Sequence, residues 1–213
     1  PNLARLANRM VTIRSMTSSN GDHDEGGYVA QTSYNPSTVT APAPHWLSVC
    51  AHQRPADDGL PSYVMLGKDN FGSLHVPGAG FLGAPYQGLN CPGGGQGPQD
   101  MPKPSEAAVA EFTRRNALRT SIGARFARGR ATNKINSHES AFDQVERLLH
   151  SGQLFDLSQE STKDRDRYGD SNLGRDCLLA ARLVEQGVPF VRVQHQSGLA
   201  WDKHRRAFQS QRW

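Results

Sequence analysis

The sequence predicts an α/β fold with parallel strands. An amphipathic helix expected at residues 172–186 ends at Gly187, and a β-branched run follows at residues 188–193. Glycine ends helices readily because it adopts left-handed backbone angles without steric cost. A helix that leads through a glycine into a short strand is half of a βαβ unit, and such units build parallel sheets. Two further β-prone runs, residues 11–16 and 62–66, are candidates for neighbouring strands.

The N-terminal half is expected to alternate short elements with long polar loops. Residues 2–10 have the apolar spacing of a helix, which leads into the strand at residues 11–16. A polar loop with several glycines, residues 17–27, follows that strand, and a short helix is expected at residues 46–52. Residues 67–105 hold ten glycines and six prolines with almost no periodic pattern. We interpret them as a long Gly/Pro-rich, loop-rich insertion.

Helices are expected to dominate from residue 106 onward. The helical segment at residues 106–150 contains one helix at residues 106–126 and another at residues 140–150, because apolar side chains recur there every three or four positions. Between Arg114 and Lys134 the chain carries seven cations and no acid. Such a block either binds phosphates or nucleic acid, or it is the solvated face of a helix whose other face is apolar.

The three cysteines allow at most one disulfide bond. Cys177 lies on the apolar stripe of the helix at residues 172–186 and is expected to be a buried free thiol. Cys50 and Cys91 lie in loop-like sequence and can pair if the protein is exported. No C-x-x-C motif occurs, which argues against a zinc ribbon or a redox-active pair.

Two polar loops that follow predicted strands carry the candidate site residues. Both combine acidic side chains with histidine: Asp22, His23, Asp24 and Glu25 in the first loop, and His195, Asp202 and His204 in the second. Ligands of open α/β sheets bind outside the carboxyl ends of the strands. Carboxylates and imidazoles together suit a divalent metal ion, so the two loops predict a metal site.

Several other catalytic chemistries are excluded because their sequence motifs are incomplete or missing. Residues 50–54 have the C-x-x-x-R spacing from which sulfatases make formylglycine, but His52 stands where that motif needs proline or alanine. Residues 93–97 lack the Lys-Ser/Thr ending of a phosphate-binding loop, and no G-x-S-x-G nucleophile elbow occurs. No run approaches the roughly 18 apolar residues of a membrane helix, so no membrane span is expected.

Several segments together carry a family resemblance. The most specific are RDRYGDSNLGRDCLLAARLVEQGVPFVRV at residues 165–193 and WDKH at residues 201–204, supported by GFLGAPY at residues 80–86 and FDLSQE at residues 155–160. The stretches at residues 1–17 and around His23 match as well. In this order they resemble the bacterial domain of unknown function 1501 family, which is often labelled sulfatase-like and is related to the alkaline phosphatase superfamily.

The resemblance implies a partial alkaline-phosphatase-like core with a metal centre at the strand ends. Asp202 and His204 match the family's W-D-x-H motif, and His23 matches the histidine of its early loop, near the nucleophile of relatives. By resemblance, His23 and Asp24 are therefore the candidate catalytic residues. Asp202, His204 and His23 are the candidate ligands of a divalent metal ion, which polarises an ester and activates the attacking group.

The sequence also departs from the family pattern. Relatives begin earlier, with a strand that contains an aspartate, and continue to a further Asp-His pair. Residues 1–213 are therefore expected to form a single incomplete domain, an internal fragment that cannot complete a two-metal site alone. No hydroxyl in residues 17–19 stands out as the nucleophile.

The leading hypothesis is a fragment of a metal-dependent phospho- or sulfo-ester hydrolase, which we expect to be inactive by itself. Its expected substrate is a small-molecule or polysaccharide ester, and resemblance places it in the periplasm or another extracytoplasmic location. The alternative is a non-catalytic binding or structural protein that retains the hydrolase fold. Nucleic acid is not expected as a partner, because the cationic block lacks the interleaved exposed aromatics of a single-strand platform.

Overall fold

The computed structural model describes residues 3–18, 20–56, 60–67, 78–99, 105–128, 133–150 and 152–194. These residues confirm the α/β class. Three short strands, β1 (Val64–Leu66), β2 (Leu89–Cys91) and β3 (Val191–Val193), form a parallel sheet in the order β2-β1-β3. The central β1 pairs with both neighbours, so that Met65 lies beside Asn90 on one side and Arg192 on the other. The strands predicted at residues 62–66 and 188–193 are thereby confirmed.

One face of the sheet is covered by α6 (Asn172–Glu185). Ser171 caps this helix by accepting a hydrogen bond from the Gly174 N–H at 3.0 Å. The helix ends just before Gly187, which has a φ of 96°. Leu179 and Leu183 on α6 are fully buried and pack against the side chains that alternate along this face of the strands. The predicted helix–glycine–strand unit is therefore present.

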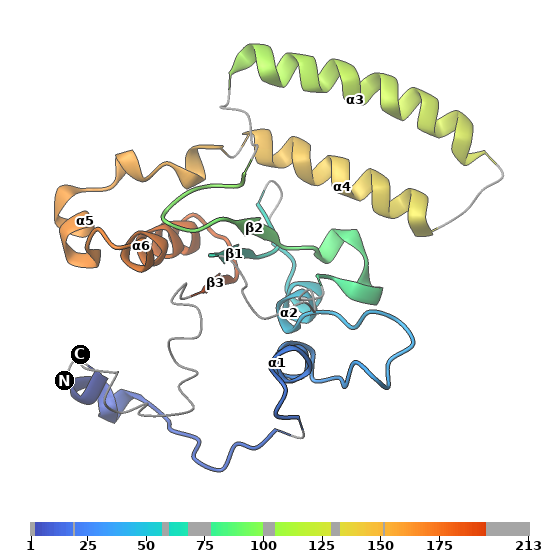
Figure 1. Ribbon diagram of the computed structural model, residues 1–213. Coiled ribbons are helices and arrows are strands. Elements are labelled where there is room, and N and C mark those ends of the chain that lie inside the picture. Colours follow the sequence, from blue (N-terminus) through green and yellow to red (C-terminus); the bar gives the residue numbers. More distant parts are fainter. Residues whose placement is uncertain are drawn as a thin grey trace.

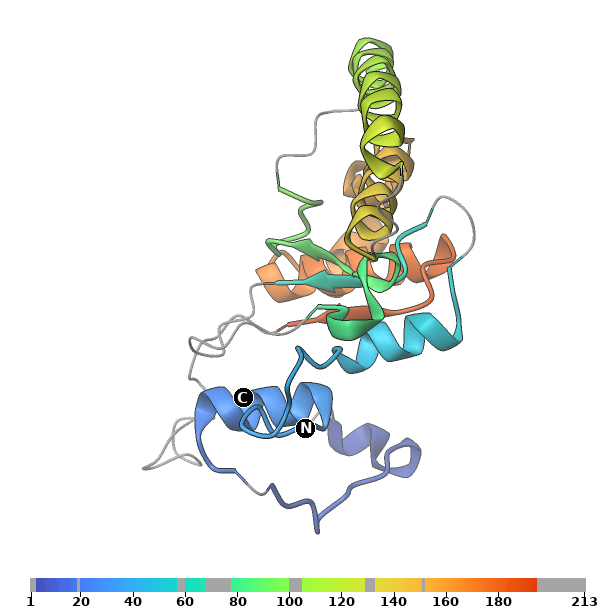
Figure 2. The same cartoon turned by 90° about the vertical axis from the view of Figure 1, so that its right-hand side faces the viewer.

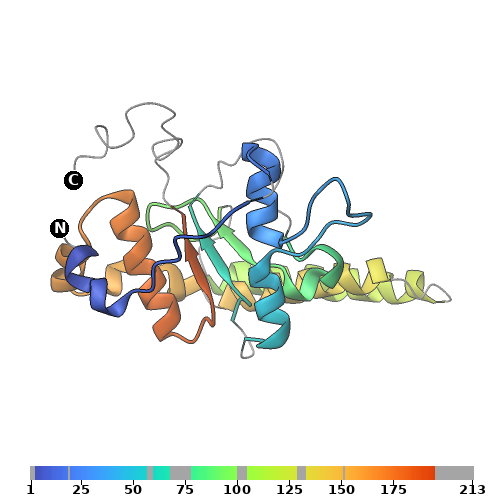
Figure 3. The same ribbon diagram turned by 90° about the horizontal axis from the view of Figure 1, so that it is seen from below.

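The opposite face is covered by α2 (Trp46–Gln53) and α1 (His23–Thr32). Leu47 and Ala51 of α2 are buried against Tyr63, which precedes β1, with Met65 packed beside them. Figure 3 shows α6 on one side of the strands and α1 and α2 on the other. The central strand β1 is apolar, with Val64 and Leu66 fully buried, because helices cover both faces of the sheet, as in other parallel sheets.

The helical segment predicted at residues 106–150 forms a hairpin of α3 (Glu106–Ala127) and α4 (Asn133–His150) that projects away from the sheet (Figure 1). The second helix begins seven residues earlier than the sequence pattern suggested. The charged stretch before α6 forms a short helix, α5 (Thr162–Tyr168). Five short 3-10 helices lie in the described residues: η1 (Leu3–Arg9), η2 (Gly80–Leu82), η3 (Ala84–Tyr86), η4 (Gly152–Phe155) and η5 (Leu157–Gln159).

The prediction of a strand at residues 11–16 is wrong. Val11, Ile13 and Met16 are 92, 67 and 78% exposed, and these residues pair with no strand in the described chain. A β-prone segment becomes a strand only where a neighbouring ladder satisfies its backbone groups. In the same half of the chain, the predicted helix at residues 2–10 is the shorter 3-10 helix η1.

The loop-rich segment predicted at residues 67–105 also contains regular structure. Within this segment lies β2, which forms an edge of the sheet, along with two single turns of 3-10 helix. No helix in the described ranges is long and apolar enough to cross a membrane.

Candidate functional site

The carboxyl ends of the three strands meet at one edge of the sheet. The Gln194 N–H, just after β3, donates to the Leu66 carbonyl oxygen at 2.7 Å, and the Gly67 N–H donates to the Cys91 carbonyl oxygen at 3.1 Å. Gly67 has a φ of 101°, and a Cβ there would lie 2.7 Å from the Gln194 carbonyl oxygen. Only glycine fits where these two segments of the backbone approach each other so closely. The strand ends are therefore held tightly together where an α/β protein places its ligands.

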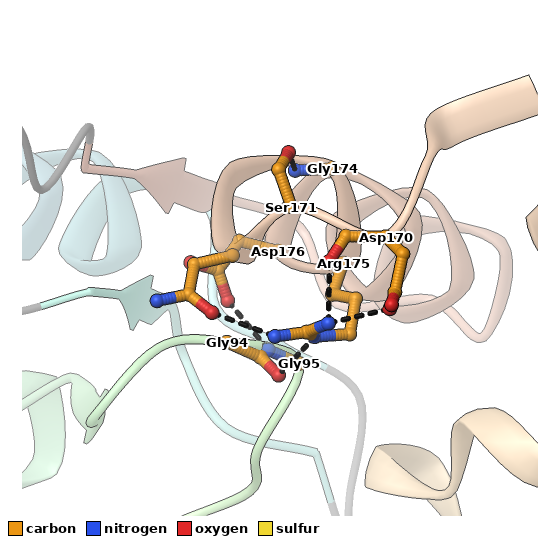
Figure 4. Close-up of polar contacts among 8 residues, drawn as sticks. Gly94, Gly95, Asp170, Ser171, Gly174, Arg175 and Asp176 are labelled. Carbon is orange, nitrogen blue, oxygen red and sulfur yellow. Dashed lines mark hydrogen bonds and ion pairs between the residues drawn. The ribbon is translucent and has the colours of Figure 1, made fainter.

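The loop after β2 is fixed to the start of α6 by two side chains (Figure 4). The Gly95 N–H donates to Asp176 Oδ1 at 2.8 Å, and Arg175 Nε donates to the Gly94 carbonyl oxygen at 3.0 Å. Gly93, Gly94 and Gly95 all have positive φ angles, between 74 and 91°. The glycine run, residues 93–95, is thus a defined turn, and the hydrogen bonds of Arg175 and Asp176 hold it against α6. We call this pair of hydrogen bonds the clasp.

A buried carboxylate lies behind this turn. Asp176 is fully buried, and its Oδ2 has no hydrogen-bond partner among the described residues. Burial, reinforced by the negative charge of Asp176, raises the pKa of the nearby Cys91 thiol to about 12. The same two causes raise the pKa of Cys177. These thiols stay protonated at neutral pH and are poor nucleophiles.

The cysteines do not form the disulfide bond considered from the sequence. Cys50, Cys91 and Cys177 are all free. The loop-like sequence around the first two was misleading, since Cys50 belongs to α2 and Cys91 to β2. The two lie in elements whose packing, rather than a covalent bond, holds them in place.

On the other face of the sheet, Arg192 joins α1, α2 and the strand edge. Its Nη1 donates to Gln31 Oε1 of α1 at 2.7 Å and lies 3.1 Å from His45 Nε2, while its Nη2 donates to Gln194 Oε1 at 2.7 Å. His45 Nδ1 accepts the Leu47 N–H at 3.0 Å and caps α2. Burial, followed by the positive charge of Arg192, lowers the pKa of His45 to about 4. His45 is therefore a neutral structural residue at physiological pH.

The structure places His23 and Asp24 in a helix rather than in the predicted loop. Both lie in the first turn of α1, whose N-cap is Asp22. The Asp22 carboxylate accepts the N–H groups of Asp24 at 2.8 Å and Glu25 at 3.0 Å, and these backbone hydrogen bonds lower its pKa. Acidic residues favour a helix N-terminus because of the helix dipole, which explains why the helix starts here despite two glycines. In Figure 2, α1 begins on the side of the sheet toward which the strands point.

The remaining predicted site residues, His195, Asp202 and His204, lie outside the described residues. Among the residues that are described, no group of three or more His, Cys, Asp or Glu side chains could hold a metal ion. Of the predicted catalytic and metal-binding residues, the structure describes His23 and Asp24, which share one helix terminus.

A separate cavity of about 570 Å³ lies between η5, α5 and the start of α6. Its lining combines cations, acids, hydroxyls and two leucines: Leu157, Ser158, Thr162, Arg165, Asp166, Gly169, Asp170, Arg175 and Leu178. Arg175 joins this cavity to the glycine turn, because its Nη1 also bonds Asp170 Oδ1 at 2.5 Å.

Sequence reasoning missed Arg192, His45 and Asp176. Arg192 lies within a predicted strand, Asp176 within a predicted helix and His45 in a proline-rich stretch just before a helix, and none of them belongs to a recognisable motif. Asp176 has the helical spacing of the buried Leu179 and Leu183, and this acid on an apolar helix face was the one available clue.

Comparison with protein families matches residues 1–212 to the family described as "Protein of unknown function (DUF1501)". No curated protein and no solved structure matches the chain. The family match spans nearly every residue and agrees with the resemblance drawn from residues 165–204. The chain belongs to the DUF1501 family.

Proposed function

We propose that this chain belongs to a metal-dependent hydrolase that cleaves phosphate or sulfate esters. The hydrolase would be of the sulfatase-like type, in the alkaline phosphatase superfamily. The observation that carries the proposal is the common edge of the sheet. The strand ends converge there at Gly67 and Gln194, and α1 begins with His23 on the same side. Parallel sheets of α/β proteins bind their ligands at this edge.

The donor set fits a divalent ion. Imidazole nitrogen and carboxylate oxygen, the groups of His23, Asp202 and His204, are ligands that zinc and related ions accept. Asp202 follows Gln194 by eight residues, and an extended chain of that length reaches roughly 26 Å. The segment is therefore long enough to bring Asp202 of the W-D-x-H motif to the strand ends. A bound ion would polarise the ester and stabilise the charge that develops on it.

The chain's own residues supply the frame for that chemistry. Arg192 ties Gln194, at the end of β3, to Gln31 of α1, so the strand end and the helix that carries His23 are joined. Asp24 follows His23 in the same turn and is our candidate for the group that moves a proton at the ester. The expected substrate is a small-molecule or polysaccharide ester, and the expected location is the periplasm or another extracytoplasmic space.

One observation favours the alternative, a non-catalytic binding or structural protein with the same fold. The Ser18 hydroxyl, close to the expected nucleophile position, donates to the Asn20 carbonyl oxygen at 2.9 Å and accepts the Asn20 N–H at 3.2 Å. A hydroxyl engaged on both sides by the backbone is not poised to attack an ester.

Turnover of aryl phosphate and aryl sulfate by the intact gene product, with and without added zinc or manganese, tests the proposal. We expect metal-dependent turnover that is lost in His23→Ala and Asp24→Asn and kept in His52→Ala, an exposed histidine on α2. Metal binding without turnover of either ester would support the non-catalytic alternative. Equal turnover in all of these variants would contradict the assigned site.

A further inference from the structure

The outermost element of the molecule is α3, the first helix of the projecting hairpin (Figures 1 and 2). It has 22 residues, and none of them is buried. Its neighbour α4 covers only one face. Asn116 Nδ2 donates to Glu146 Oε2 at 3.1 Å, and the Arg119 guanidinium lies 4.2 Å from the centre of the Phe142 ring.

A second face of α3 carries large apolar side chains. Leu118 and Ile122 are 63 and 60% exposed, and Phe126, which continues the line, is 59% exposed. A spacing of four residues places these side chains on one side of the helix, so they form a continuous stripe. This stripe lies beside the face that α4 covers, since Arg119 and Leu118 are adjacent in sequence.

The stripe is bordered by arginines. Arg114 and Arg125 lie on the side away from α4, Arg119 lies on the side of α4, and Arg128 follows the last turn. Glu111 forms ion pairs with Arg114 at 2.9 Å and Arg115 at 2.5 Å, and no acid occurs from residue 112 to residue 138. Beyond Glu111, the rim of the stripe is therefore positively charged.

We propose that α3 docks on an anionic lipid surface, with its apolar stripe inserted at the level of the headgroups. An apolar helix face bordered by basic residues is the pattern of helices that lie in the membrane interface. The arginine side chains are long enough to reach lipid phosphates while the stripe is inserted. Charge complementarity therefore selects an anionic surface.

The size of the stripe favours lipid over a protein partner. Three side chains exposed by about 60% present on the order of 300 Å², whereas a stable protein interface buries about 800 Å² on each side. A lipid surface needs no such area, because the attraction between arginines and anionic headgroups adds to the insertion of a few apolar groups. The proposal does not depend on the hydrolase function.

Co-sedimentation of the chain with lipid vesicles tests the proposal. We expect binding to vesicles of equal parts phosphatidylglycerol and phosphatidylcholine, and little binding to phosphatidylcholine alone. The double variants Leu118→Ser/Ile122→Ser and Arg125→Gln/Arg128→Gln should each lower the partition coefficient by about tenfold or more. All four positions are exposed, so these variants should keep the helical circular dichroism of the unaltered chain.

Matched controls lie on other helices. Val184→Ser removes an exposed apolar side chain from α6, and Lys163→Gln/Arg165→Gln removes two exposed cations from α5, so both should leave vesicle binding unchanged. Equal binding to both kinds of vesicle, or equal loss in the control variants, would overturn the proposal. So would binding to duplex DNA or to an acidic helical peptide with no binding to the anionic vesicles.

Discussion

Arg175 and Asp176, neighbours in the first turns of α6, hold consecutive residues of the same glycine turn. Arg175 Nε donates to the Gly94 carbonyl oxygen at 3.0 Å, and Asp176 Oδ1 accepts the Gly95 N–H at 2.8 Å. Two adjacent side chains thus satisfy an acceptor and a donor of one turn. The turn adjoins the carboxyl edge of the sheet, so this clasp fixes part of the frame of the proposed site.

The first prediction concerns the clasp itself. Asp176→Ala should lower the free energy of unfolding by about 1–3 kcal/mol, because the half-buried Gly95 N–H loses its acceptor. Asp176→Asn should cost less, since its amide oxygen can still accept that hydrogen bond. Urea unfolding measures both values. An alanine variant as stable as the unaltered chain would show that the clasp contributes nothing.

A pair of glycine substitutions tests the shape of the turn. Gly95 has a φ of 75°, and a Cβ there would lie 2.8 Å from Leu157 Cδ1 and 2.9 Å from Arg175 Cβ. Because both the backbone angle and the space disfavour a side chain, Gly95→Ala should destabilise the protein by at least about 1 kcal/mol. Gly123 lies on α3 with no atom within 4 Å of a Cβ, and Gly123→Ala should stabilise that helix by about 0.5–1 kcal/mol. Thermal unfolding of the two variants should therefore shift in opposite directions, and shifts in the same direction would contradict the described turn.

The stability of the protein should fall in mild acid because of His45. Both ring nitrogens face hydrogen-bond donors, the Leu47 N–H and the Arg192 guanidinium, so an added proton finds no acceptor. The pKa of His45 is about 4 in the folded chain, against 6.5 for an ordinary histidine. The unfolded chain therefore takes up the proton first, and stability is lost progressively as the pH falls from about 6.5 to about 4.

The variant His45→Asn should remove this part of the pH dependence, on the order of 2–3 kcal/mol. Asparagine is a good N-cap, so the start of α2 is preserved. Urea midpoints measured across this pH range give the comparison. Identical pH profiles for the variant and the unaltered chain would contradict the neutral, buried state of His45.

Cysteine labelling distinguishes the three free thiols. Cys91 is 2% exposed and its pKa is raised to about 12, so iodoacetamide at about pH 8 should leave it unmodified in the folded chain and modify it in urea. Cys50 is partly exposed on α2 and should react first. Mass spectrometry of the peptides identifies the modified residue, and rapid labelling of Cys91 in the folded chain would count against the described core.

Local sequence patterns predicted the elements whose neighbours in the chain are also their neighbours in space. The helix α6, Gly187 and β3 follow one another directly, and β1 is a compact apolar run, so each was visible in the sequence. The short strand β2 was missed because its three residues lie between Gly88 and Pro92, which indicate only a loop. Residues 11–16 carry a strand pattern, but the ladder that would make them a strand depends on distant residues.

The candidate site was predictable in kind but not in arrangement. His23 and Asp24 were found from their proximity to each other in sequence, yet their helix was missed because two glycines follow, and the capping by Asp22 outweighs them. The contact of Arg192 with Gln31 joins residues 161 positions apart, and no local pattern reports a hydrogen bond of that range. Tertiary packing decides such contacts.

The metal content of the purified chain after dialysis against zinc or manganese tests the central claim most directly. The account predicts bound metal in the unaltered chain and in His52→Ala, and loss of that metal in His23→Ala and Asp202→Ala. Elemental analysis of the four proteins gives the result. Metal content that is unchanged in both His23→Ala and Asp202→Ala would contradict the proposed site.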